Sequence, residues 1–80
     1  MMQTQAQAIV LLADLEEQAA FLSKDEGCPF YVLYQPRTHD LVCRSEGQHA
    51  LIYGLSIPFP RKKVVSTFIN GTRYEGYYEE

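Results

Sequence analysis

The segment from Thr4 to Glu26 constrains the fold most, because it contains neither glycine nor proline and is rich in Ala, Leu, Gln and Glu. These residues favour helix, and Thr4 and Gln7 have the T-x-x-Q spacing of a capping box. Gly27 is placed to end the helix in a left-handed conformation. The sequence therefore predicts a helix over about residues 4–26. Its apolar residues recur at steps of four and three, which predicts one apolar face formed by Ala8, Leu12, Leu15, Ala19 and Leu22.

From Phe30 onward the sequence changes to β-branched and aromatic residues separated by turn formers, which is typical of antiparallel strands. A first β-hairpin is predicted over about residues 30–45, with Gln35 opposite Asp40 across the turn. Because side chains alternate between the faces of a strand, this register predicts a core face. That face would carry Phe30, Val32, Tyr34, Leu41 and Cys43.

A second β-hairpin is predicted over about residues 63–78, around the Asn70-Gly71 pair that is typical of a type I′ turn. An additional strand is predicted over about residues 49–57, with Gly54 at a bulge. The last hairpin has large side chains on both faces. We therefore expect one face to pack on the helix and the other to be covered by something else, such as a second subunit.

These elements predict that residues 1–80 form a single small α+β domain. In it, one N-terminal amphipathic helix packs on a four- to five-stranded antiparallel β-meander. A chain of 80 residues buries only a limited core and is marginally stable by itself. Since neither a disulfide scaffold nor a metal is expected, self-association is the remaining source of stability. We therefore expect a homodimer, formed through either the uncovered sheet face or an edge strand.

Charge is distributed unevenly along the chain, although the net charge is only −3. Residues 1–30 contain five acidic residues and one basic residue, whereas residues 31–74 contain six basic and two acidic residues. An acidic net charge disfavours indiscriminate binding to nucleic acid or to an anionic membrane. The basic part of the chain leaves room for a specific anionic ligand.

The cysteines and histidines give no pattern of a catalytic or metal site. Cys28 and Cys43 lack the C-x-x-C spacing of zinc and redox motifs, and the predicted hairpin holds them too far apart for a disulfide. His39 and His49 do not complete a zinc pattern with them. We therefore expect two reduced thiols, no catalytic residues, no metal and no cofactor. The first residues resemble neither a signal peptide nor a membrane span, so a cytoplasmic location is expected.

Aromatic residues suggest how the chain acts. Tyrosine and arginine are enriched at the energetic centres of protein interfaces, because each combines a large apolar body with a polar tip. We expect part of the tyrosines to pack in the core and the others to form an exposed surface on the sheet. The residues predicted to bind a partner protein are Tyr31, Arg73, Tyr74, Tyr77 and Tyr78.

Basic residues offer an alternative interpretation. Arg and Lys side chains beside aromatic residues on a sheet can hold phosphates while bases stack, as in single-strand binding proteins. The residues predicted for such an anion site are Arg37, Arg61, Lys62 and Lys63. A purely structural explanation is that the Arg61-Lys62-Lys63 triplet keeps the following apolar strand soluble.

The sequence thus favours a small non-catalytic protein-interaction module. Such a module would act as an inhibitor, adaptor or accessory subunit that docks a larger protein through an aromatic sheet surface. Small acidic domains of this kind are common among phage and mobile-element proteins. The alternative function is an anion-binding module for a nucleotide or single-stranded nucleic acid.

Overall fold

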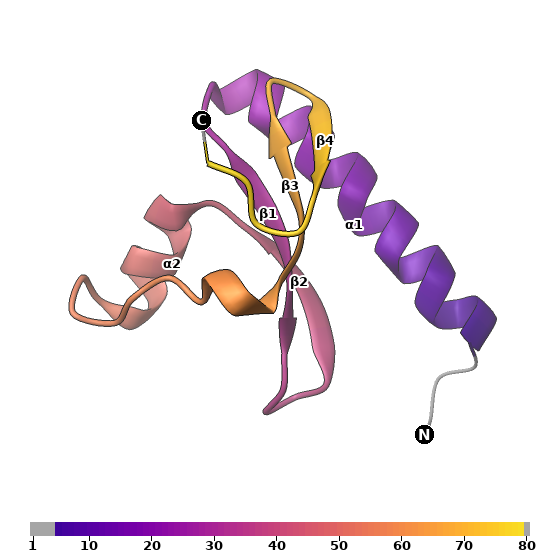
Figure 1. The fold of residues 1–80 in the computed structure, drawn as a ribbon, viewed down its shortest axis with the longest axis horizontal. Coiled ribbons are helices and arrows are strands. Elements are labelled where there is room, and N and C mark those ends of the chain that lie inside the picture. The colour runs from indigo at the N-terminus through magenta and orange to yellow at the C-terminus, as the bar shows by residue number, and fades with distance from the viewer. Residues whose placement is uncertain (1–4, 80) are drawn as a thin grey trace.

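A computed structural model describes residues 5–79, with side chains from Leu11 onward (Figure 1). The predicted helix is confirmed as α1 (Gln5–Glu26), and Gly27 follows it with a φ of 69°. This left-handed conformation ends the helix, as the sequence predicts. The T-x-x-Q capping box begins at Thr4, which lies outside the described residues.

Four strands form one antiparallel sheet in the order β2-β1-β3-β4. They are β1 (Phe30–Gln35), β2 (Asp40–Arg44), β3 (Val64–Ile69) and β4 (Thr72–Glu75). The α+β class, with a helix on an antiparallel sheet, is therefore confirmed. The order departs from that of a simple meander, because β3 pairs with β1 and the chain between β2 and β3 returns to the middle of the sheet.

Both predicted hairpins are present. In the first, Gln35 pairs with Asp40, which is the predicted register. In the second, Asn70 and Gly71 have φ angles of 50° and 83°, and both values are positive as a type I′ turn requires. The second hairpin is shorter than predicted, because β4 ends at Glu75.

The strand predicted over residues 49–57 is wrong. The chain forms α2 (Glu46–Tyr53) there, then a loop, and then the 3₁₀ turn η1 (Arg61–Lys63). Ser45 caps α2 in a capping box: its Oγ accepts a hydrogen bond from the Gln48 N–H at 3.2 Å, and the Gln48 Oε1 accepts one from the Ser45 N–H at 3.1 Å. Gly54, predicted at a bulge, is instead the C-terminal cap of this helix, with a φ of 89°.

The first core lies between α1 and the sheet, as predicted. Its buried centre is Ala19, Phe30, Val32 and Phe68, and the residues packed around it include Leu12, Leu15, Leu22, Leu41 and Cys43. Cys43 pairs with Val32, and burial raises the pKa of its thiol from 9.0 to about 11. Tyr34 departs from the prediction: it lies near the end of β1 and is 37% exposed.

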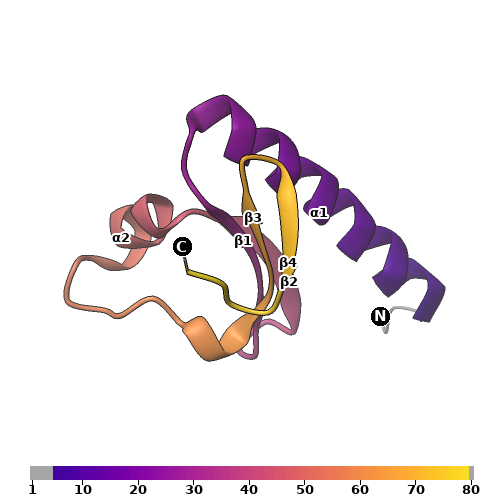
Figure 2. The same ribbon diagram turned by 45° about the horizontal axis from the view of Figure 1, so that its top comes forward.

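A second core lies on the opposite face of the sheet. Figures 1 and 2 show α1 on one side of the sheet and α2 with the following segment on the other. The buried residues of this core are Tyr31, Leu33 and Val64, with Phe59 and Tyr77 packed against them. This face was expected to be covered by something outside the helix–sheet unit, such as a second subunit. The chain's own loop and C-terminal segment cover it instead.

The last hairpin is hydrogen-bonded directly to α1. Ser23 is buried near the end of α1, and its Oγ accepts a hydrogen bond from the backbone N–H of Gly71 at 2.8 Å while it donates one to the Ala20 carbonyl at 2.9 Å. A Cβ added at Gly71 would collide with the side chain of Lys24. Glycine is thus required there for its positive φ and for the close approach of the helix.

Candidate functional site

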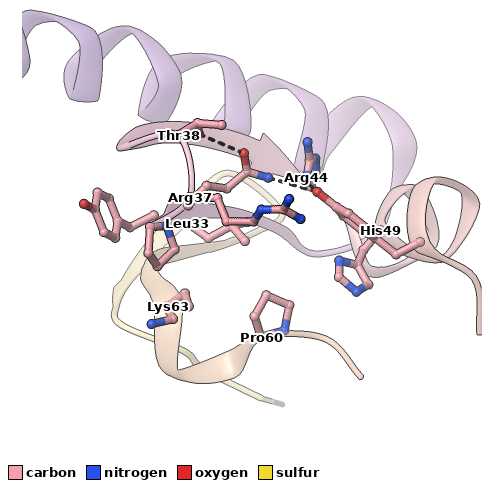
Figure 3. A pocket seen from close by; sticks show the side chains of 11 residues that line it. Leu33, Arg37, Thr38, Arg44, His49, Pro60 and Lys63 are labelled. Atoms are coloured by element: carbon pink, nitrogen blue, oxygen red, sulfur yellow. Dashed lines mark hydrogen bonds between the residues drawn. The ribbon is translucent and has the colours of Figure 1, made fainter. Parts of the chain in front are cut away.

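A cavity of about 540 Å³ opens between the β1–β2 turn, α2 and η1. Figure 3 shows it from close by. Arg37 and Thr38 come from the turn, His49 from α2, Lys63 from η1, and Pro60 is the residue just before η1. The sequence did not predict this cavity, because the prediction had no second helix. Its apolar walls include Leu33, Tyr34, Pro36 and Pro60.

A chain of hydrogen bonds orders one wall of the cavity. The Thr38 Oγ1 donates to the Gln35 Oε1 at 3.4 Å, and the Gln35 Nε2 donates to the Tyr53 Oη at 3.2 Å. The Arg44 Nη1 donates to the same Tyr53 oxygen at 3.1 Å. Since this oxygen accepts two hydrogen bonds, its own O–H points elsewhere as a donor. The network joins the first hairpin to the end of α2.

Three cationic side chains line the cavity: Arg37, Arg44 and Lys63. The residues that line it include no carboxylate, and within the described part of the chain none of these three cations forms an ion pair. The Arg44 guanidinium also lies 5.5 Å from the centre of the Tyr53 ring, within cation–π range. The cavity therefore concentrates positive charge next to apolar walls.

His49 is the buried polar residue of this cavity. Its side chain lines the cavity wall, and the residue is only 6% exposed. Its ring packs against Tyr53 at 4.7 Å and against Phe59 at 5.4 Å between ring centres. Neither ring nitrogen has a hydrogen-bond partner among the described residues. A buried polar group without a partner lowers stability, so a phenylalanine would fit this structural position better.

The predicted anion-binding residues do not form one site. Arg37 and Lys63 both line the cavity, and so does Arg44. The Arg61 guanidinium instead lies 5.0 Å from the Tyr77 ring centre and 3.9 Å from a Glu79 carboxylate oxygen. Lys62 lines an adjoining hollow, which shares Pro60 and Lys63 with the cavity and also includes Glu46.

The predicted tyrosine surface is divided between the core and the edge of the sheet. Tyr31 was predicted to contact a partner, but it is only 3% exposed. Its ring stacks on Tyr77 at 5.6 Å and packs against Phe59 at 4.8 Å between ring centres. Burial is the main cause that raises the pKa of the Tyr31 hydroxyl, and the nearby charge of Glu46 adds to it. Tyr31 therefore belongs to the second core and cannot contact a partner in this structure.

Of the other predicted partner-binding residues, Tyr77 packs against the second core, whereas Arg73, Tyr74 and Tyr78 lie at the β4 edge. Arg73 pairs with Phe68 in the sheet and binds Glu16 of α1 at 2.7 Å and Glu75 at 3.0 Å. Tyr74 and Tyr78 stack on each other with ring centres 3.9 Å apart. These three residues thus have intramolecular contacts, while the Arg73 and Tyr78 side chains stay partly exposed.

Exposed apolar side chains gather elsewhere, in the segment from Leu51 to Ile57. We call Leu51, Ile52, Leu55 and Ile57 the apolar segment; each of these residues is at least half exposed. Leu51 and Leu55 are 88% and 93% exposed. The sequence predicted a strand over these residues and no exposed surface. The S-x-x-Q pattern at Ser45–Gln48 is the signal that could have shown the helix.

Reactive groups outside the cavity are few in the described residues. Cys28 is exposed and Cys43 is half-buried, and both are free thiols. Across this part of the chain, no three His, Cys, Asp or Glu side chains come together as metal ligands. Likewise, no helix within residues 5–79 has the length and apolar character that a membrane crossing requires.

Comparison of the chain with protein-family models, with curated proteins and with solved structures gave no match.

Proposed function

We propose that this protein is a small non-catalytic interaction module that docks a larger protein through the apolar segment. The observation that carries this proposal is the exposure of Leu51, Ile52, Leu55 and Ile57 within seven consecutive residues. Single exposed leucines are normal on protein surfaces, whereas a contiguous exposed apolar patch is typical of an interaction site.

The packing of the rest of the molecule supports this choice of surface. The first core is closed by α1, and the second is closed by Phe59 and Tyr77. The apolar segment lies outside both cores. Burial of a leucine side chain contributes about 1.5–3 kcal/mol, so two such residues provide a substantial share of a binding free energy.

The docking surface thus differs from the one predicted on the sheet. In the proposal, Tyr74 and Tyr78 stay at the edge of the sheet and contribute only where the partner extends that far. Two free cysteines suit a reducing compartment, and we place the module in the cytoplasm. Its partner is a larger protein that offers an apolar groove of matching size.

The proposal is tested with a double variant in which Leu51 and Leu55 are replaced by glutamate. Wild-type protein and the variant are immobilised and exposed to lysate of the source organism, and retained proteins are identified by mass spectrometry. We expect one stoichiometric partner that the wild type retains and the double variant loses. The matched control is Phe21→Glu, because Phe21 is 65% exposed on α1, away from the segment.

Two outcomes of this experiment would contradict the proposal. A partner that the double variant retains as well as the wild type, or that Phe21→Glu also loses, would contradict docking through the apolar segment. Circular dichroism of each variant checks that the fold is intact. Since the substituted leucines are almost fully exposed, we expect no loss of structure.

In the absence of a partner, the proposed module is a homodimer that buries the same apolar segment. Light scattering of the purified wild type is expected to give twice the mass of one chain. The double variant with Leu51→Glu and Leu55→Glu is expected to give the mass of one chain. A monomeric wild type at high micromolar concentration would contradict the homodimer while leaving the docking experiment unaffected.

A further inference from the structure

We infer that the cavity between the β1–β2 turn, α2 and η1 binds a nucleoside monophosphate. This inference concerns a different surface from the apolar segment and does not depend on the docking proposal. It rests on three features of the cavity: its unpaired cations, its apolar walls and the buried histidine without a hydrogen-bond partner.

The cations define the charge of the ligand. Arg37, Arg44 and Lys63 line the same cavity, and no carboxylate in its lining neutralises them. Arginine presents a planar set of donors that fits phosphate oxygens in pairs, and lysine adds a compact charge. The Tyr53 hydroxyl, which accepts two hydrogen bonds from the protein, has its proton available for a phosphate oxygen. A phosphate group is therefore the anion that this lining fits best.

The size and walls of the cavity require more than a phosphate ion. Its volume of about 540 Å³ lies in the range of pockets that hold small organic ligands. Leu33, Pro36 and Pro60 give it apolar walls, and the Tyr34 and Tyr53 rings add flat surfaces. Flat aromatic groups of this kind are the ones on which bases stack. The ligand thus combines a phosphate with a planar ring system.

His49 indicates that the ring system has a polar edge. A neutral imidazole has one donor nitrogen and one acceptor nitrogen, and both are unpartnered here among the described residues. Both nitrogens are shielded from solvent, so a ligand reaches one of them only when the ring turns about its Cβ–Cγ bond toward the cavity that the side chain lines. The edge of a nucleobase has neighbouring donors and acceptors of its own, so it satisfies the group that the folded chain leaves without a partner.

The experiment is isothermal titration calorimetry of the wild-type protein with AMP, GMP, CMP and UMP. Inorganic phosphate, the four unphosphorylated nucleosides and a ten-residue oligothymidylate serve as comparison ligands. We expect at least one monophosphate to bind about tenfold or more tightly than its nucleoside and than phosphate, because both parts of the ligand contribute. Tighter binding by the oligonucleotide than by every monophosphate would overturn the inference in favour of a single-strand binding surface.

Variants then locate the site. Arg37→Gln is the main variant, because Arg37 is exposed in a turn and we expect its replacement to preserve the fold. We expect it to weaken monophosphate binding about tenfold or more through loss of a charged hydrogen bond. Lys62→Gln is the matched control: this exposed cation lies outside the cavity lining, so its replacement is expected to change the affinity less than about twofold.

His49→Phe separates recognition of the base from recognition of the phosphate. We expect it to reduce the differences in affinity among the four monophosphates while the Arg37→Gln effect persists. Three results would each overturn the inference: no monophosphate binds at millimolar concentration, Lys62→Gln weakens binding as much as Arg37→Gln, or His49→Phe leaves the preference among bases unchanged. Tests of the docking surface remain independent, since the Leu51 and Leu55 side chains do not line the cavity.

Discussion

Ser23 and Ser66 are both buried serines, and their hydroxyl groups have different surroundings. The Ser23 Oγ accepts a hydrogen bond from the Gly71 N–H and donates one to the Ala20 carbonyl. The Ser66 Oγ has no partner among the described residues. A buried hydroxyl that has hydrogen-bond partners contributes to stability. One without partners lowers the free energy of unfolding, because the loss of its hydrogen bonds to water is not compensated. The two residues thus form a natural pair for comparison.

Ser23→Ala is expected to lower the free energy of unfolding by about 1–3 kcal/mol, because it leaves the Gly71 N–H without its partner inside the folded protein. Urea denaturation followed by circular dichroism measures this difference. Ser66→Ala is the matched control, and we expect it to leave the free energy of unfolding unchanged or to raise it. Equal losses in both variants would show that volume, and not hydrogen bonding, determines the effect.

Single residues also mark how far the sequence could predict the candidate sites. Arg37 and Lys63 were predicted as anion-binding residues, and both line the cavity. Tyr31 was predicted on a surface but is buried, because both faces of β1 are apolar and the sequence does not show that Phe59 and Tyr77 cover the second face. A residue's type gives its chemistry, but its exposure depends on segments that are distant in sequence.

At the scale of elements, the two hairpins were predictable because the signals for their turns are local. Asn70-Gly71 requires positive φ at both positions, and the turn fixes the register of the strands beside it. Within residues 49–57, which were predicted as a strand, Leu51, Tyr53, Leu55 and Ile57 alternate along the chain. This alternation corresponds to no buried face, since all four side chains are exposed. Periodicity alone does not separate a short helix from a strand.

The capping box at Ser45 and Gln48 stabilises the first turn of α2, and its contribution can be measured. Ser45→Ala removes the side chain that accepts a hydrogen bond from the Gln48 N–H, and we expect it to lower the free energy of unfolding by about 0.5–2 kcal/mol. Gly47→Ala in the same helix is expected to raise it by about 0.5–1 kcal/mol, because alanine favours helix and a Cβ fits there. Thermal denaturation of both variants measures the changes.

Ser45→Ala and Gly47→Ala are expected to change the free energy of unfolding in opposite directions, so a general effect of substitution in α2 cannot explain both. If both substitutions left stability unchanged, α2 would not contribute to the cooperative unfolding of the domain. If Gly47→Ala lowered stability, a helical conformation at this position would be contradicted.

At the scale of the whole molecule, the chain covers both faces of its sheet by its own segments. The sequence led us to expect a second subunit there, because one helix covers only one face of a sheet. The loop after α2 and the C-terminal segment perform this role: Phe59 and Tyr77 pack on Tyr31, and the Thr67 Oγ1 binds the Gly76 carbonyl at 2.8 Å and the Tyr78 N–H at 3.0 Å. Self-association is therefore argued from the apolar segment and no longer from an open sheet.

Stability of the whole molecule is expected to fall above pH 9. Burial raises the pKa of Cys43 from 9.0 to about 11, so the unfolded chain releases this proton at a lower pH than the folded chain does. The protonated Cys43 thiol therefore contributes its full stabilisation of the folded state below pH 9, and this stabilisation is lost as the pH rises toward 11. We expect a decrease on the order of 1–2 kcal/mol between pH 8 and pH 10.5 from this group, measured by urea denaturation with a reductant present.

Two cysteine variants provide the comparison. Cys43→Ala is expected to show a smaller decrease over the same pH interval, although its stability at pH 8 is lower because a buried group is removed. Cys28→Ala alters an exposed thiol and is expected to retain the wild-type pH dependence. A Cys43→Ala variant with the full wild-type decrease would assign the effect to other groups, such as Tyr31, whose pKa is also raised by burial.

The hydrogen bond between Ser23 and Gly71 joins residues that are 48 positions apart. A ribosome makes α1 long before it makes the last hairpin, and β1 is made well before its neighbour β3. The apolar face of the nascent helix can pack on the first hairpin, whose Phe30, Val32 and Leu41 belong to the first core, but the Ser23 hydroxyl has no Gly71 to bind at that stage. The native arrangement is therefore completed only after residue 71 has left the ribosome, when the last hairpin supplies Phe68 to the first core and the Gly71 N–H to Ser23.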